Sequence, residues 1–394
     1  MPEPCAAWGV NFNVTLDPES ASNGRRYIPF LSLRDEIEPM AMQLEQAASR
    51  VIRSGQYLFG QEVEAFEQQW AGVLGRQGAV GCANGLDALS LSLRALEIGP
   101  GDEVIVPDMT FVATALAVIH CGAVPVIVDV DSTTLLMDPA RIEEAISPRT
   151  RAVIPVHLYG QMADVESIAA LVGDEIAIIE DAAQAHLATR WGGSPGKHSA
   201  LSCYSFYPGK NLGALGDGGA IVSDRLELLS KVRELGNYGQ RNKYDHRSIG
   251  LNSRLDEIQA AFLQVRLKHL LVQTHRRRQI ASRYGSALEN HAKIELLTID
   301  SGNEAVWHVY PIRVAHPQKL ARTLDEFGIG TQHHYSNSLS NITAIRNKIK
   351  ISGNTSVARA AAARLISLPI GASILDQQVD WVIEVLLREI EKCS

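Results

Sequence analysis

The sequence predicts an α/β fold in which a mostly parallel central sheet is flanked by helices and followed by a smaller α+β unit. Short β-rich apolar runs alternate with amphipathic segments, and they occupy residues 104–106, 124–128, 152–156 and 176–179. Strands that are buried on both faces read as continuous apolar runs of this kind. A helical pattern from Leu255 to about Leu288 then leads to a β-rich run at 309–314 and a final helix at 377–392.

The same patterns divide the chain of 394 residues into three parts. Residues 1–26 are rich in Pro, Ser and Asn without periodicity, which predicts an irregular leader. Residues 27–270 form the predicted large domain, and residues 271–394 form a small C-terminal domain. A hydrophobic content of 46% is enough to bury a core in each domain.

The bulk composition excludes several classes of partner. The net charge of −7 is spread over both signs without long like-charge runs, so no nucleic-acid partner is expected. The five cysteines are scattered and form no C-x-x-C pair, which indicates reduced thiols, a cytoplasmic location and no structural metal site. No apolar run reaches about 18 residues, so we expect no membrane span.

Polar and aromatic residues follow three of the apolar runs. These strand ends are residues 107–111, 157–160 and 180–184. In open α/β sheets, ligands bind outside the carboxyl ends of the strands. The sequence therefore predicts a binding site where these ends converge.

Lys210 lies in the segment 202–213, among aromatic and small residues, directly before a glycine-rich turn at 216–219. An amine in a partly desolvated pocket has its charged form disfavoured, and the neutral amine is the form that condenses with an aldehyde. A lone lysine is more often a surface-loop residue, but the surrounding segment argues against that interpretation of Lys210.

Asp181 ends the apolar run 176–181, which carries its carboxylate to the predicted site. A carboxylate against the pyridine nitrogen of pyridoxal phosphate (PLP) keeps that ring a good electron sink. Gln184, three residues later, is placed to hydrogen-bond the ring oxygen. An equally ordinary role for Asp181 is that of a helix N-cap.

Asn84, Gly85 and Leu86 open an amphipathic helix after the apolar run 79–82. Free backbone N–H groups at such a helix start are a natural phosphate seat, although a plain helix start is the more common interpretation of one glycine. Phe111, at another strand end, is able to stack on a cofactor ring, but an aromatic at such a place is more often part of the core.

Together these segments resemble the DegT/DnrJ/EryC1/StrS family of PLP-dependent sugar aminotransferases, a branch of the aspartate-aminotransferase fold type. The resemblance runs from about Tyr27 to Arg283 and is carried by the ordered motifs 101–107, 155–161, 180–186, 205–219 and 252–257. It implies that the large domain binds PLP as a Schiff base on Lys210, with Asp181 at the pyridine nitrogen.

The resemblance also implies the other cofactor contacts. Gln184 would contact the ring oxygen and Phe111 would stack on the ring. The phosphate would be held by the backbone of Gly85 and Leu86, by the hydroxyl of Ser205, and by Asn252 from a second subunit. The family pattern thus implies a homodimer with shared active sites, whereas Asn252 taken alone reads as an ordinary helix N-cap.

The chain departs from the family pattern at two places. Asn84-Gly85-Leu86 replaces the usual Ser-Gly-Thr of the phosphate turn, a variant typical of enzymes that resemble 3-keto-sugar aminotransferases. After the pair His334-Tyr335, Ser336 replaces a proline and Ser340 replaces a histidine. The candidates for substrate contact are Tyr238, His334 and Tyr335, and a packing or hydrogen-bonding role is an equally good interpretation of each.

The function that the resemblance implies is a ping-pong transamination. L-Glutamate would convert PLP to pyridoxamine phosphate (PMP), and a nucleotide-linked 3-keto-6-deoxyhexose would then accept the amine. A 4-keto-sugar, a sugar aldehyde or a cyclitol ketone remains an alternative acceptor. A PLP-dependent sugar dehydratase is a further alternative, but that branch of the family replaces the Schiff-base lysine by histidine, and this chain has Lys210.

Overall fold

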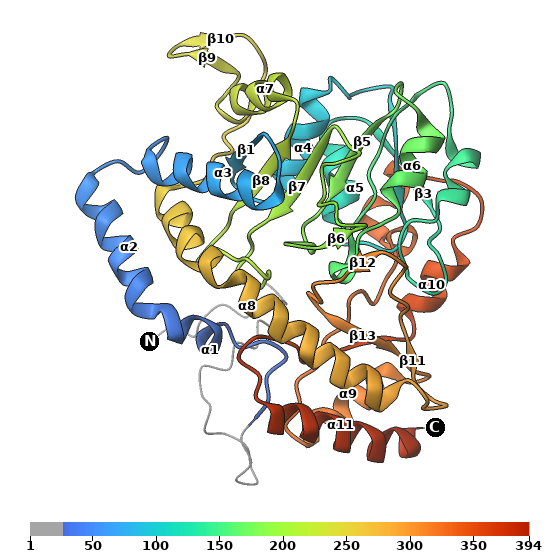
Figure 1. The fold of residues 1–394 in the computed structure, drawn as a ribbon. Helices are drawn as coiled ribbons and strands as arrows, with labels where there is room; N and C mark the ends of the chain where they lie inside the picture. The colour runs from blue at the N-terminus through green and yellow to red at the C-terminus, as the bar shows by residue number, and fades with distance from the viewer. Residues whose placement is uncertain (1–26, 394) are drawn as a thin grey trace, which may run out of the picture.

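The computed structural model describes residues 27–393, and the predicted leader at 1–26 lies outside the described residues (Figure 1). The predicted α/β fold is confirmed. Across the central sheet its eight strands are β1 (Gly78–Cys82), β8 (Gly219–Ser223), β7 (Leu201–Ser205), β5 (Ala177–Asp181), β4 (Thr150–Val153), β2 (Glu103–Pro107), β3 (Val124–Val128) and β14 (Lys350–Ile351). Only the β1–β8 and β8–β7 pairs are antiparallel, so the sheet is mostly parallel.

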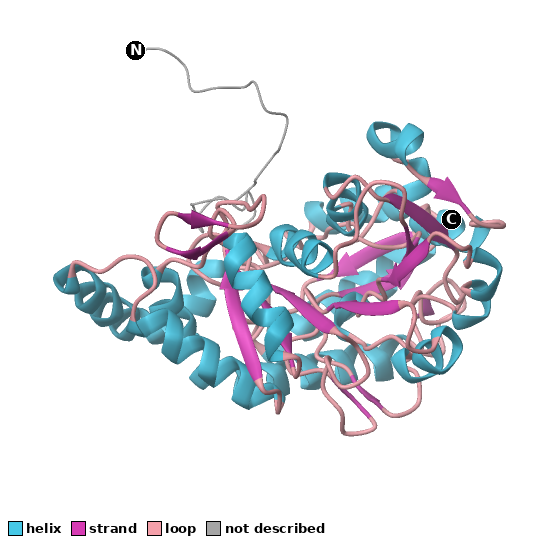
Figure 2. Ribbon diagram, turned by 90° about the horizontal axis from the view of Figure 1, so that it is seen from above, coloured by secondary structure: helices cyan, strands magenta, loops and turns pink. Residues whose placement is uncertain are grey.

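Helices cover both faces of this sheet (Figure 2). Because successive residues of a strand point to opposite faces, Val104 and Val106 of β2 pack into one hydrophobic core and Ile105 packs into another. The first core is covered by α4 (Gly85–Ala95), α5 (Ala113–His120) and α7 (Leu226–Gly236), and the second by α6 (Val165–Val172). A third core lies under α3 (Gln61–Leu74). Burial on both faces explains the continuous apolar runs of the sequence.

The C-terminal part of the chain builds a separate hydrophobic core. An antiparallel sheet of β11 (Glu295–Leu296), β13 (Tyr310–Arg313) and β15 (Leu365–Leu368) packs there with α9 (Pro317–Glu326) and α11 (Asp376–Ile390). The β-rich run and the final helix expected from the sequence correspond to β13 and α11.

Helix α8 (Glu257–Leu288) connects the two regions, as its periodicity predicts (Figure 1). Its first half packs against α2 (Ala41–Ser54) and α3, and its last turns lie in the C-terminal core. The predicted boundary at residue 270 falls inside this helix and stays a prediction. The chain also passes between the regions elsewhere, because Ile28 bridges to Ile329 and β14 pairs with β3.

The chain also forms several shorter elements. They are α1 (Leu33–Ile37), α10 (Ser356–Ala362), the hairpin of β9 (Gln240–Asn242) with β10 (Asp245–His246), and the pair β6 (Thr189–Arg190) with β12 (Asn303–Glu304). Among the helices of residues 27–393, none is long and apolar enough to cross a membrane.

Candidate active site

The three polar strand ends lie side by side at one edge of the central sheet. The backbone N–H of His157 donates to the carbonyl of Asp181 at 3.0 Å, and Asp181 N–H donates to Pro155 at 2.9 Å. Ala182 N–H donates to the carbonyl of Cys203, in β7, at 2.8 Å. Parallel strands end at the same edge, so residues that are distant in sequence share one surface.

The Asp181 carboxylate is buried at this edge and is held by two donors. The Thr114 hydroxyl donates to Oδ2 at 2.9 Å and the Ala183 N–H donates to Oδ1 at 3.2 Å. A turn follows β5, so Asp181 caps no helix. Burial raises the pKa of Asp181 above its usual value despite the Thr114 and Ala183 hydrogen bonds. A positive group on a ligand would stabilise its charged form.

Lys210 lies in a turn after β7, where its backbone N–H donates to the carbonyl of Tyr207 at 2.8 Å. The residue is partly buried, so it is not a surface lysine. Burial lowers the pKa of the Lys210 amine to about 8, while the nearby Asp181 carboxylate acts in the opposite direction. About a tenth to a fifth of this amine is therefore neutral between pH 7.0 and 7.4, compared with roughly a thousandth or less at the ordinary lysine pKa.

Gln184 is buried and connects two elements of the site. Its Oε1 accepts from the Tyr159 N–H at 2.7 Å, and its Nε2 donates to the Tyr335 hydroxyl at 2.9 Å. The Tyr335 ring centroid lies 5.7 Å from that of Phe111. The Phe111 side chain is 55% exposed although Met109 and Thr110 are buried, so Phe111 is not a core residue. Its free face is available to a planar ligand.

The start of α4 has the features of a phosphate seat. Asn84 is its N-cap and accepts from the Asp87 N–H at 2.8 Å, while Ala88 N–H donates to the Asn84 carbonyl. The N–H groups of Gly85 and Leu86 find no acceptor within residues 27–393. A Cβ on Gly85 would lie 2.7 Å from the Cβ of Ser205, which is too close for any residue other than glycine. Glycine therefore allows the start of α4 to lie directly against Ser205.

His334 is held near the same cluster by its backbone and its ring. Its carbonyl accepts from the Tyr159 hydroxyl at 2.5 Å, and its Nδ1 lies 3.0 Å from the Ser367 hydroxyl. Burial lowers the pKa of His334 to about 4, and the positive charge of Lys210 acts in the same direction. The imidazole is therefore neutral at physiological pH. The His334 ring contacts the Tyr335 ring, which in turn contacts Phe111 and whose hydroxyl accepts from Gln184, so these residues link His334 to the rest of the site.

Ser340 explains one departure from the family pattern. Its N–H and its hydroxyl donate to the buried carboxylate of Asp108 at 2.7 and 2.8 Å. Asp108 directly follows β2, so this contact anchors the segment after His334 and Tyr335 to the sheet edge. The Ser340 hydroxyl thus provides a hydrogen-bond donor to the Asp108 carboxylate at the position where the family pattern has a histidine.

Within residues 27–393, no hydrogen bond or ring contact joins Tyr238 or Asn252 to this cluster. Both are exposed, and Asn252 forms a β-bridge with Asn237. Helix α8 starts at Glu257 with Asp256 as its N-cap, so Asn252 caps no helix. The Arg254 guanidinium lies 5.4 Å from the Tyr238 ring centroid.

Sequence reasoning missed four residues that build the site: Thr114, Tyr159, Asn211 and His308. Tyr159 lies in the polar segment 157–160 that follows a predicted strand, and it has a positive φ of 60°, which is uncommon for a bulky residue. The contacts of Thr114, Asn211 and His308 join segments that are far apart in the sequence. No local pattern identifies such residues.

Comparison with known proteins places the chain among sugar-modifying enzymes. A model of the DegT/DnrJ/EryC1/StrS aminotransferase family matches residues 40–387. The chain is 42% identical to dTDP-3-amino-3,4,6-trideoxy-alpha-D-glucose transaminase of Streptomyces venezuelae, over 93% of this chain and 97% of the relative. It is 41% identical to dTDP-3-amino-3,6-dideoxy-alpha-D-galactopyranose transaminase of Aneurinibacillus thermoaerophilus, over 92% of this chain and 99% of the relative.

Solved structures agree with this placement. The crystal structure of DesV from S. venezuelae superposes with a TM-score of 0.90 at 42% identity and covers 93% of this chain and 99% of its own. The structure of NtdA from Bacillus subtilis, with bound cofactor PMP, superposes with a TM-score of 0.86 at 31% identity and covers 93% of this chain and 86% of its own.

Proposed function

Because this chain belongs to the DegT/DnrJ/EryC1/StrS aminotransferase family, we propose that it transfers an amino group from L-glutamate to a nucleotide-linked 3-keto-6-deoxyhexose. The chain is a sugar transaminase that uses PLP. The observation that carries the proposal is the partly buried Lys210 amine beside the buried Asp181 carboxylate. Both relatives described above are named for dTDP-linked 3-amino sugars, which supports the choice of acceptor.

The residues at the sheet edge fit PLP. Lys210 would hold the cofactor's aldehyde carbon and Asp181 its pyridine nitrogen, and Gln184 would contact its ring oxygen. The unpaired N–H groups of Gly85 and Leu86, with the Ser205 hydroxyl, would hold the phosphate, and the exposed face of Phe111 would cover the ring. When bound, PLP supplies an electron sink for the carbon that bears the nitrogen.

The chain's own residues would then manage protons and orientation. A Lys210 amine with a pKa of about 8 both gives and takes a proton readily near neutral pH, as the proton transfer of each half-reaction requires. The neutral ring of His334 and the Tyr335 hydroxyl, which is bonded to Gln184, would orient the sugar. The buried Asp181 carboxylate would keep the pyridine nitrogen protonated.

Assay of purified enzyme with L-glutamate and a matched pair of dTDP-linked keto-6-deoxyhexoses tests the proposed acceptor. We expect amination of the 3-keto isomer with a kcat/KM at least about tenfold above that of the 4-keto isomer, since about 1.4 kcal/mol of differential binding suffices. Mass spectrometry of the product and of 2-oxoglutarate is the measurement. A preference for the 4-keto isomer, or turnover only with a cyclitol ketone, would overturn the acceptor while leaving the transaminase class intact.

The proposal also includes a homodimer in which Asn252 completes the phosphate site of the opposite subunit. An exposed surface of aromatic and aliphatic side chains supports it: the exposed fractions are 57% for Tyr57, 49% for Phe59, 45% for Tyr238 and 89% for Ile249. Exposed apolar side chains that gather in this way mark protein interfaces. The Arg254 guanidinium lies 5.6 Å from the Phe59 ring centroid and 5.4 Å from the Tyr238 ring centroid, which places Phe59 and Tyr238 in one patch.

The loop that bears Tyr57 and Phe59 is firmly held, as an interface requires. The buried Glu257 carboxylate accepts from the N–H groups of Gly60 at 2.8 Å and Val63 at 3.1 Å, and Glu257 N–H donates to the Tyr57 carbonyl at 3.1 Å. A rigid loop loses little conformational entropy when it is buried against a partner.

Subunit complementation tests whether Asn252 acts across the dimer. Inactive Lys210→Ala chains are mixed with Asn252→Ala chains, which we expect to bind cofactor weakly. If Asn252 acts in trans, each heterodimer has one wild-type site and one site with both defects, so activity should recover to about half of wild type per dimer. A mixture of Lys210→Ala with Asp181→Asn chains is the control, because both residues belong to the same chain's site and no wild-type site can form. Confirmed subunit exchange without recovery would place Asn252 outside the partner's site.

A further inference from the structure

The segment Val306–His308 lies between two parts of the candidate site. On one side, Val306 N–H donates to the Gly160 carbonyl at 2.9 Å and His308 N–H donates to the Tyr159 carbonyl at 3.0 Å. Tyr159 in turn donates its own N–H to Gln184 Oε1. The segment is thus fixed, through one turn, to the residue proposed to contact the cofactor's ring oxygen.

On its other side, the segment is bound by Asn211, the neighbour of Lys210. The Asn211 amide is buried, and its Nδ2 donates to the Val306 carbonyl at 3.0 Å. Its Oδ1 lies 3.2 Å from His308 Nδ1. Because Nδ2 is the donor to Val306, Oδ1 must be the acceptor, and the His308 proton therefore sits on Nδ1.

We propose that Asn211 and His308 are positioning residues that hold the Lys210 amine at a fixed place relative to Gln184, and so relative to the ring of the bound cofactor. The inference rests on the proposed role of Lys210. One continuous series of hydrogen bonds joins Asn211, the chain neighbour of Lys210, to Gln184. It runs from Asn211 to Val306 and His308, from these to Gly160 and Tyr159, and from Tyr159 to Gln184. Proton transfer needs such fixed geometry, because a displacement of about 1 Å costs on the order of 10²-fold in rate.

The third support of the segment is Arg277, in helix α8. Its Nη1 donates to the His308 carbonyl at 3.3 Å and its Nη2 pairs with Glu36 at 3.2 Å. Burial lowers the pKa of His308 well below its usual value, and the positive charges of Lys210 and Arg277 act in the same direction. His308 therefore binds Asn211 as a neutral ring and adds no charge beside the Lys210 amine.

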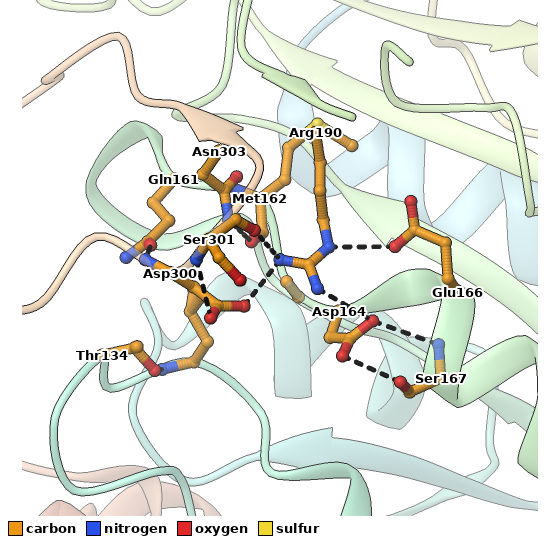
Figure 3. A network of polar contacts seen from close by, with 12 residues as sticks. Thr134, Gln161, Met162, Asp164, Glu166, Ser167, Arg190, Asp300, Ser301 and Asn303 are labelled. Atoms are coloured by element: carbon orange, nitrogen blue, oxygen red, sulfur yellow. Dashed lines mark hydrogen bonds and ion pairs between the residues drawn. The ribbon is translucent and has the colours of Figure 1, made fainter. Parts of the chain in front are cut away.

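Asn303 provides a matched control a few residues earlier in the same segment. Its Oδ1 accepts from the Met162 N–H at 2.9 Å and its Nδ2 donates to the Met162 carbonyl at 3.1 Å. Asn303 and Met162 lie beside the cluster of Arg190 with Asp164, Glu166 and Asp300 (Figure 3). Like Asn211, the Asn303 side chain donates one hydrogen bond and accepts one, but Asn303 is not adjacent to Lys210 in the sequence and does not bond His308.

The test compares holoenzymes carrying Asn211→Ala, His308→Phe, both changes, or Asn303→Ala. The readout is the pH titration of the absorbance of the lysine-bound cofactor, alongside thermal unfolding, kcat and KM. Loosening the amine admits water, which favours the protonated nitrogen, so we expect the titration midpoint to rise by about one pH unit in each single variant. We also expect kcat to fall about tenfold or more with little change in KM. The double variant should shift no further than the larger single one, since the two residues act through one bond.

The control distinguishes positioning from general stability. Asn303→Ala should lower the unfolding temperature but leave the titration midpoint in place. Equal midpoints in all variants would overturn the inference, and so would an additive double variant. If Asn211→Ala does not fold, His308→Phe still tests the inference. This variant loses the bond between His308 and Asn211 but keeps the bond from Asn211 to Val306. Borohydride reduction and peptide mapping of each holoenzyme distinguish a failure of the positioning inference from a failure of the proposed site. Cofactor trapped on another lysine would overturn the role of Lys210 itself.

Discussion

Lys210→Ala is expected to abolish transamination, with kcat/KM lower by about 10⁴-fold or more, while the chain stays folded. The amine would be lost both as the attachment point of the cofactor and as the group that moves the proton. Burial disfavours the charged amine and lowers its pKa to about 8, so the residue contributes little to folding stability that its removal would forfeit. Lys197→Ala, at an exposed lysine nearby in the sequence, is the control and should behave as wild type.

Borohydride reduction followed by peptide mass spectrometry measures the attachment directly. The wild type should carry the reduced cofactor on the peptide that contains Lys210, and Lys210→Ala should carry none. Attachment should also depend on pH. With a pKa of about 8, the neutral fraction of the amine rises about tenfold between pH 7 and pH 9 and then levels off, so the rate of cofactor attachment should follow that curve. Cofactor found on another lysine would contradict the assignment.

Asp181→Asn is expected to lower the rates of both half-reactions by about 10²-fold or more, with the fold retained. The amide keeps the size of the side chain, and its oxygen still accepts from the Thr114 hydroxyl, but it lacks the negative charge that would hold a proton on the pyridine nitrogen. The same charge raises the pKa of Lys210, so its removal should move the pKa of that amine further below about 8. Stopped-flow rates with glutamate and with the keto-sugar, together with the pH titration, are the measurements.

Asp129→Asn is the matched control for Asp181→Asn. Asp129 is also a buried carboxylate near a strand end, but it accepts from the N–H groups of Val357 and Ala358 at 2.9 Å each. We expect this change to lower stability and to leave both half-reactions within a few fold of wild type. If Asp181→Asn behaves in the same way, Asp181 only holds the turn that contains Ala183.

The fold class follows from local sequence pattern, and the same pattern predicts which residues carry the chemistry. A parallel sheet that is buried on both faces requires strands with continuous apolar runs, and a long helix such as α8 requires apolar residues at helical spacing over its length. Both elements can therefore be predicted from local sequence pattern. Lys210 and Asp181 could be singled out because glycine-rich and strand-end settings are themselves local features. Ordered motifs then identified the family, and the comparisons confirmed it.

Two of the alternatives that the sequence left open are resolved by how the chain folds. Phe111 could have been core and Asp181 could have been an N-cap; exposure of the one and a turn after the other settled these alternatives. The bonds of Gln184 with Tyr335 and of Asn211 with His308 join residues 151 and 97 positions apart. Such contacts depend on how the C-terminal segments pack against the sheet edge, and side-chain periodicity, which reports only the buried face of a single element, does not encode that packing.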